Sequence, residues 1–173
     1  MKATGIVRRV DELGRLVIPK EIRRTMRLAE GTPLEIFTDR EGQIILKKYS
    51  PMMELGSFAK QYAESVAQTM NQKVAVSDRD QIIAVAGGGK RELLGKTISR
   101  QLEEMIINRE NSIQAGLDKK TIPLISGDED SYSAQAIYPI CCEGDCIGAV
   151  ILYSRENQTR FSETEYKAAA CAA

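Results

Sequence analysis

The chain has 173 residues, 43% of them apolar, and its 24 basic and 24 acidic residues give a formal net charge of zero. This length suits one large or two small domains. The absence of histidine excludes His-based acid–base catalysis and most zinc sites. No apolar run reaches the roughly 18 residues of a membrane span, and Arg8 and Arg9 interrupt the N-terminus where a signal peptide would be apolar. We therefore expect a cytoplasmic protein that makes no membrane contact.

The charge is unevenly distributed along the chain. Residues 1–50 contain eleven basic and seven acidic residues, a balance of +4, and the remainder contains thirteen and seventeen, a balance of −4. This asymmetry predicts that the N-terminal part meets an anionic partner.

The first 50 residues predict four short strands and one helix. Strands are expected over 4–10 and 15–18, a helix over 19–27 that Pro19 opens at its first position, and a hairpin over 34–38 and 43–49. A unit this small buries little surface and needs oligomerisation, a metal or disulfides. Because it contains neither cysteine nor histidine, we expect a homodimer through residues 1–50 with intertwined strands.

Basic side chains concentrate in the first half of this unit. At about 100° per residue, the four cations of the predicted helix share one side, opposite Ile22 and Met26. Arginine predominates, and its planar fork suits phosphate groups and guanine edges. The candidate DNA-binding residues are Arg8, Arg9, Arg15, Lys20, Arg23, Arg24 and Arg27.

A solvated charged face is the alternative interpretation of this set. The nearby acidic residues Asp11, Glu12 and Glu21 are too few to neutralise it, which favours binding to an anion. No aromatic residue precedes Phe37 to stack on unpaired bases. Double-stranded DNA, contacted through its backbone and grooves, is therefore the expected partner.

Residues 51–72 predict an amphipathic helix that links two domains. Its apolar positions recur at spacings of three and four: Leu55, Ala59, Tyr62, Val66 and Met70. This pattern fits both a helix packed on its own domain and a coiled-coil-like dimer seam, and both remain open here.

Residues 73–173 predict a second domain. Strands are expected over 74–77 and 81–86, a helix over 97–109, strands over 121–125, 133–141 and 145–153, and a last helix opened by a capping box from Ser162 to Glu165. Runs of strands with segregated helices indicate an α+β fold with an antiparallel sheet.

Other motifs in this domain have plainer interpretations. The run from Gly87 to Lys90 lacks the spacing and the Ser/Thr of a phosphate-binding loop, so we expect a turn. Cys141, Cys142 and Cys146 lack a fourth nearby ligand, so we expect no metal. Cys141 and Cys146 are expected to face each other across a hairpin, where they could oxidise. No catalytic residue or cofactor-binding motif is visible, and we expect no cofactor and no enzymatic activity.

Motifs in the first 50 residues resemble those of a known family. GIVR at 5–8, DELGRLVIP at 11–19, EIRRT at 21–25 and the hairpin over 34–49 are similar to the swapped-hairpin DNA-binding domain of AbrB-type transition-state regulators. The resemblance implies a β-barrel built by an intertwined dimer. It also implies that Arg8, Arg15, Arg23 and Arg24 contact DNA, with Arg9 and Lys20 less firmly fixed by the pattern.

The rest of the chain resembles a GAF domain, an antiparallel sheet with flanking helices. Together the resemblances imply a repressor and activator of sporulation genes in endospore-forming bacteria, and a homotetramer associated through residues 51–173. A GAF-like domain could serve oligomerisation or the sensing of an unknown small-molecule effector. The alternative function is an antitoxin-like protein-binding module, because antitoxins share the swapped-hairpin fold.

Overall fold

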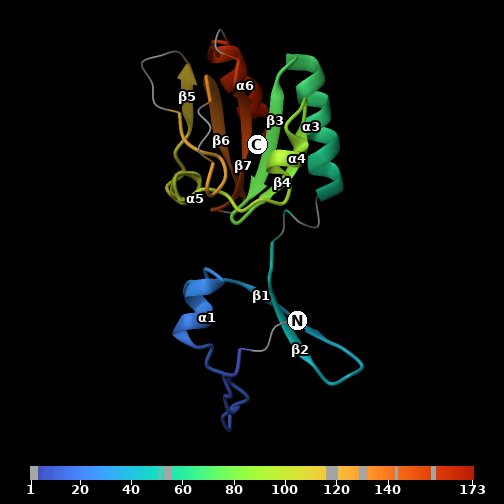
Figure 1. The fold of residues 1–173 in the computed structure, drawn as a ribbon, viewed down its shortest axis with the longest axis vertical. Coiled ribbons are helices and arrows are strands. Elements are labelled where there is room, and N and C mark those ends of the chain that lie inside the picture. The colour runs from blue at the N-terminus through green and yellow to red at the C-terminus, as the bar shows by residue number, and fades with distance from the viewer. Residues whose placement is uncertain are drawn as a thin grey trace. The chain divides into compact units, whose positions relative to one another are not determined.

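The computed structural model describes residues 4–50, 52, 56–115, 121–128, 132–142, 144–156 and 159–173. The chain divides into two compact units, Met1–Tyr49 and Ser50–Ala173 (Figure 1). Each unit is described below by itself.

The N-terminal unit contains one short helix and one hairpin. Helix α1 spans Lys20–Thr25, and strands β1 (Leu34–Thr38) and β2 (Ile44–Lys48) pair antiparallel. Asp39 closes the hairpin, because its side chain accepts hydrogen bonds from the backbone N–H groups of Glu41 and Gln43 at 3.0 and 2.9 Å. The predicted hairpin is thus confirmed.

The two strands predicted at the start of the chain form no ladder among the described residues. Segments 4–10 and 15–18 lie on either side of a turn and pair with no strand that the structure describes. Their apolar side chains are largely exposed, including Val7 at 84% and Val17 at 73%, and Pro19 is the one buried residue within 4–49. The described residues 4–49 of a single chain therefore form no buried apolar core.

Helix α1 is shorter than the sequence predicts. Pro19 lies at the N-cap, one position before the expected one, and the helix ends at Thr25 with Met26 as its C-cap. Arg27 takes a left-handed conformation with φ 51°. The N–H groups of Leu28 and Arg27 then donate to the carbonyls of Arg23 and Arg24 at 2.7 and 3.3 Å. This is a Schellman arrangement, which stops the helix and takes Arg27 off its surface.

The C-terminal unit is built on a five-stranded antiparallel sheet with the order β4-β3-β7-β6-β5. The α+β class is confirmed. In chain order its elements are α3 (Gly56–Met70), β3 (Lys73–Asp78), β4 (Ile82–Ala86), α4 (Lys90–Leu93), α5 (Arg100–Ile107), β5 (Ser112–Ala115), β6 (Ala134–Cys142), β7 (Asp145–Ser154) and α6 (Glu163–Ala172).

Both faces of this sheet are covered, which makes three layers (Figure 1). Successive residues of a strand point to opposite faces, so Val150 and Leu152 join a core with α3 and α6. Ala149 and Ile151 join a second core, to which α4 contributes Leu93 and α5 contributes Leu102 and Ile106. Because both faces are covered, residues that point to either face are buried, and the strands are apolar at nearly every position.

Helix α3 packs on its own sheet. Ala59, Ala63 and Ala67 are buried against the strands, whereas Phe58 and Tyr62 stay 62% and 36% exposed with their rings stacked. Leu55 lies outside the described residues. The interpretation as a helix packed on its own domain is confirmed, and the dimer seam stays a prediction.

The predicted strand over 121–125 is wrong. Among the described residues this segment contributes one isolated bridge, between Ile98 and Ile125, and the fifth strand is β5 instead. The capping box of α6 is confirmed: the Ser162 N–H donates to Glu165 Oε2 at 2.7 Å. Within the described ranges, no helix is both long and apolar enough to cross a bilayer.

Candidate nucleic-acid interface

All seven predicted DNA-binding side chains are exposed, and they fall into three groups along the N-terminal unit. Arg8 and Arg9 lie in the segment 4–10, and Arg15 follows the turn that comes next. Lys20, Arg23 and Arg24 lie on α1, and Arg27 lies just beyond its end.

The three cations of α1 form the densest group. Lys20, Arg23 and Arg24 are at positions i, i+3 and i+4, which places them side by side on one helix face. Within the described part of the chain none of the three has a carboxylate partner. Such a face concentrates positive charge that no neighbouring carboxylate offsets.

Arg15 is held in place by Asp11. One Asp11 oxygen accepts from the backbone N–H groups of Leu13 and Arg15 at 3.0 and 2.7 Å, and the other accepts from Arg15 Nε at 2.7 Å. These bonds lower the pKa of Asp11 from its usual value of 3.8. The largest effect comes from the backbone N–H of Arg15, and the next from its guanidinium. Asp11 therefore stays ionised at neutral pH and fixes both the turn and the direction of the Arg15 side chain.

The expectation that Arg27 continues the helical stripe is wrong. Its left-handed backbone turns it away from the row formed by Lys20, Arg23 and Arg24. Sequence spacing alone could not show this, because a left-handed residue after the C-cap is usually glycine. Arg27 remains an exposed cation of the same unit.

Residues from several segments of the unit line one apolar hollow of about 270 Å³. Its walls include Arg8 and Val17 of the two segments before α1, Ile22 of α1, Leu34 of β1 and Leu46 of β2. Arg8 thus borders the same hollow as α1, and its guanidinium donates to the Val7 carbonyl at 3.1 Å. Arg9 and Arg15 do not line this hollow.

In the C-terminal unit the glycine run forms a turn, as expected. Gly87, Gly88 and Gly89 follow β4 directly, all with positive φ, and the Tyr153 hydroxyl donates to the Gly88 carbonyl at 3.0 Å. The helix that follows, α4, has only four residues. Among the described residues, no cluster of three or more Cys, Asp or Glu side chains could hold a metal.

Comparison with known proteins matches each unit separately. A family model described as stage V sporulation protein T C-terminal, transcription factor, matches residues 54–173. A second, described as antidote-toxin recognition MazE, bacterial antitoxin, matches residues 7–53. Among individual relatives, stage V sporulation protein T of Bacillus subtilis is 49% identical over 173 residues, which is all of this chain and 95% of the relative.

The transition state regulatory protein AbrB of B. subtilis is 66% identical over 53 residues, 31% of this chain and 54% of that protein. The solution structure of its N-terminal DNA recognition domain is 67% identical and covers 30% of this chain and 94% of its own, with a TM-score of 0.25.

A solved GAF domain from an Acinetobacter phosphoenolpyruvate-protein phosphotransferase covers 73% of this chain and 79% of its own. Its TM-score is 0.56 at 13% identity, a likeness that shows a GAF fold and nothing about ligands. The full-length identity and the family match over residues 54–173 agree with each other. The chain belongs to the stage V sporulation protein T family of transcription factors.

Proposed function

We propose that this protein is a DNA-binding regulator, both repressor and activator, of sporulation genes, and that it acts in the cytoplasm and catalyses no reaction. The observation that carries the proposal is the exposed face formed by Lys20, Arg23 and Arg24, which have no carboxylate partner among the described residues. The same unit also presents Arg15, whose side chain Asp11 orients. The 66% identity to a transition-state regulator over 53 residues supports it.

A homodimer through residues 1–50 accounts for the apolar surface of the N-terminal unit. Val7, Leu13 and Val17 are each at least 73% exposed, and Ile44 is 72% exposed. Several large apolar side chains this exposed in one small unit favour an interaction site. Segments 4–10 and 15–18, which pair with no described strand, also have backbone groups that a partner strand could bond. A second copy would both cover the apolar side chains and pair with these backbone groups.

Dimerisation would double the cationic surface. The cations of α1, the anchored Arg15 and the two arginines of the first segment would then be presented twice, related by a two-fold axis. Phosphate contacts from such a surface set register and affinity, and arginine forks can reach guanine edges in the major groove.

A salt titration of DNA binding tests this proposal. We expect Arg23→Gln and Lys20→Gln each to lower the slope of log K against log salt by about one, measured on a duplex that the wild-type chain selects from a random pool. Arg40→Gln is the matched control, because Arg40 is an exposed cation of the same unit outside the proposed face. Wild-type slopes in both test variants would contradict the proposal.

The C-terminal unit would associate dimers into a homotetramer, sense a small molecule, or both. Its GAF fold is compatible with each role. We favour association, because Phe58 on α3 leaves a large apolar side chain 62% exposed that a second copy could cover. A shift in melting temperature with nucleotides or amino acids would instead identify an effector.

An antitoxin-like function is the second candidate, favoured by the match of residues 7–53 to the MazE family. This function would require a segment that wraps a toxin. The chain continues instead into a folded unit with two apolar cores. A ribonuclease that co-purifies in stoichiometric amount would favour the antitoxin function over DNA regulation.

A further inference from the structure

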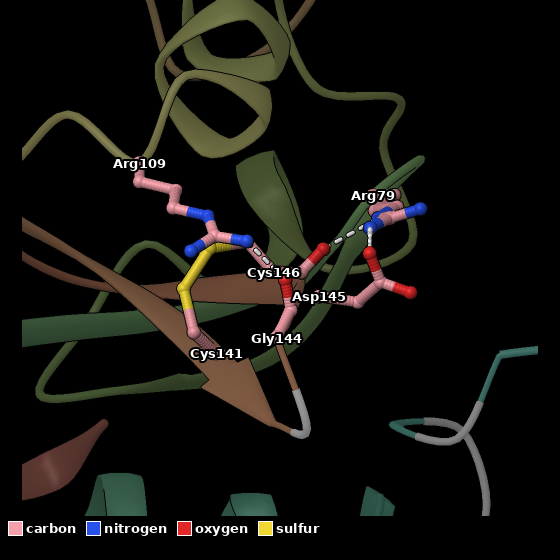
Figure 2. The surroundings of a disulfide bond; sticks show 6 residues. All are labelled: Arg79, Arg109, Cys141, Gly144, Asp145 and Cys146. Carbon is pink, nitrogen blue, oxygen red and sulfur yellow. Dashed lines mark hydrogen bonds and ion pairs between the residues drawn. A yellow bond between two sulfur atoms is a disulfide. The ribbon is translucent and has the colours of Figure 1, made fainter.

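A disulfide joins Cys141 and Cys146 at the tip of the β6–β7 hairpin (Figure 2). The two residues pair directly across the strands. Cys141 lies at the exposed end of β6, whereas Cys146 is 3% exposed and belongs to the core covered by α4 and α5. The disulfide therefore joins an exposed residue to a buried one.

An irregularity of the ladder selects this pair. Ile140 pairs with Gly148, but Cys141 pairs with Cys146, so Ile147 is an extra residue on β7. Without this bulge, the register would place Cys142 opposite Cys146. Gly148 beside the bulge lies against the Ser77 carbonyl of β3, where a side chain would clash. The sheet thus fixes which of two adjacent cysteines faces the buried one.

Two guanidinium groups from outside the hairpin hold its tip (Figure 2). Arg79, from the turn between β3 and β4, donates to the Cys146 carbonyl at 2.5 Å and lies 3.9 Å from the Asp145 carboxylate. Arg109, which follows α5, donates to the Gly144 carbonyl. Cations beside a cysteine favour the thiolate, which is the reactive form in thiol–disulfide exchange.

We propose that Cys141 and Cys146 form a reversible redox site that exchanges electrons with low-molecular-weight disulfides. This inference rests on the proposed function in one respect: a DNA regulator works in a reducing compartment. Disulfides that form there are transient or serve redox sensing rather than permanent stabilisation.

The exchange balances in two steps. The Cys141 thiolate attacks one sulfur of the small-molecule disulfide, which forms a mixed disulfide and releases one thiolate. The Cys146 thiolate then attacks Cys141 Sγ, forms the intramolecular bond and releases the second thiolate. Two electrons pass from the protein dithiol to the small-molecule disulfide, and the two thiol protons end on the released thiols.

Peptide mass mapping of the full chain after incubation with oxidised glutathione tests this site. In the wild-type chain we expect the Cys141–Cys146 bond and its loss when reduced glutathione is added. In Cys146→Ser, which has no resolving thiol, glutathione should accumulate on Cys141. Cys142→Ser is the matched control and should close the bond as the wild type does.

Three results would overturn the proposal. They are free thiols at both positions in the wild type, a bond between Cys142 and Cys146, and glutathione retained on Cys142 rather than Cys141 in Cys146→Ser. None of these measurements depends on DNA, so failure here is distinct from failure of the proposed function.

The contribution of the arginines is tested separately by the rate of Cys141 alkylation in the reduced protein. Arg109→Gln should be alkylated several-fold more slowly than the control variant Arg100→Gln. Arg100 lies on the surface of α5 and pairs with Glu104. Equal rates in the two variants would contradict activation by Arg109.

Discussion

At the scale of single residues, Asp11 acts through Arg15. The variant Asp11→Asn keeps an oxygen for the turn N–H groups but loses the charge that fixes the guanidinium. We expect general DNA affinity not to fall, because a negative charge is removed, while discrimination between a selected and a random duplex falls several-fold. Fluorescence anisotropy on the two duplexes measures this ratio. An equal loss on both would instead indicate a damaged turn.

The same pair predicts a pH dependence. The pKa of Asp11 is lowered on folding, so its contribution is complete above the unfolded value near 3.8 and is lost only as pH falls through the lower folded value. We therefore expect the discrimination ratio to be constant between about pH 8 and pH 5. A ratio that changes within this range would show that another group controls Arg15.

Arg27 combines a backbone cost with a charge. Its left-handed conformation favours glycine, so Arg27→Gly should stabilise the N-terminal unit by about 1 kcal/mol relative to Arg27→Ala, which keeps the Cβ. Urea unfolding at fixed protein concentration measures the difference. Both variants lose the cation, so DNA affinity should fall equally in the two if Arg27 contacts phosphate.

At the scale of elements, most strands and helices of the C-terminal unit could be predicted from periodicity, but the segment 121–125 could not. The Gln135 side chain is fully buried, and it accepts from the Ile122 N–H at 2.9 Å and donates to the Ile122 carbonyl at 2.7 Å. A side chain thus replaces the strand partner that the pattern requires. Strand β5, only four residues long with the sequence SIQA, has too weak a pattern to predict.

The N-terminal unit shows another limit of sequence patterns. Segments 4–10 and 15–18 have the β-branched composition of strands, yet one chain gives them no partner strand. Composition predicts the tendency to pair, whereas the pairing itself depends on which chain lies alongside.

The glycine turn after β4 is an element whose role can be isolated. A Cβ at Gly87 would lie 2.5 Å from the Gln72 carbonyl oxygen, whereas a Cβ at Gly95 would meet no atom within 4 Å, and both residues have positive φ, 75° and 72°. Gly95→Ala should cost about 1 kcal/mol from the backbone alone. Gly87→Ala should cost about 1–3 kcal/mol more, because backbone must move.

Denaturant unfolding of the full chain measures both glycine variants. Equal stabilities would show that the turn adapts to a side chain, against the close packing of Gly87 on Gln72 in the connection between α3 and β3.

At the scale of the whole molecule, the residue types of the candidate site and part of their grouping could be predicted. The spacing of Lys20, Arg23 and Arg24 places them on one face of the helix that the sequence predicts. The anchoring of Arg15 by Asp11 depends on a turn whose hydrogen bonds the sequence does not reveal. The departure of Arg27 from the stripe depends on how the helix ends.

The proposed tetramer uses one interface between copies in each unit. One exposed apolar residue in each unit allows the two interfaces to be tested separately. Val17, 73% exposed, lies in the N-terminal unit, and Phe58, 62% exposed, lies on the outer side of α3. In an isolated chain, replacing either by aspartate removes exposed apolar surface and costs little. If each lies in an interface between copies, the buried charge disrupts that interface.

Light scattering at working concentration, with and without DNA, distinguishes the cases. We expect four chains for the wild type, two for Val17→Asp, two for Phe58→Asp and one for the double variant. Val17→Asp should also lose DNA binding, because the cationic surface is no longer paired, whereas Phe58→Asp should bind DNA as a dimer with a reduced salt slope. A Val17→Asp variant that keeps wild-type mass and DNA affinity would contradict the dimer through residues 1–50, on which the DNA-binding surface depends.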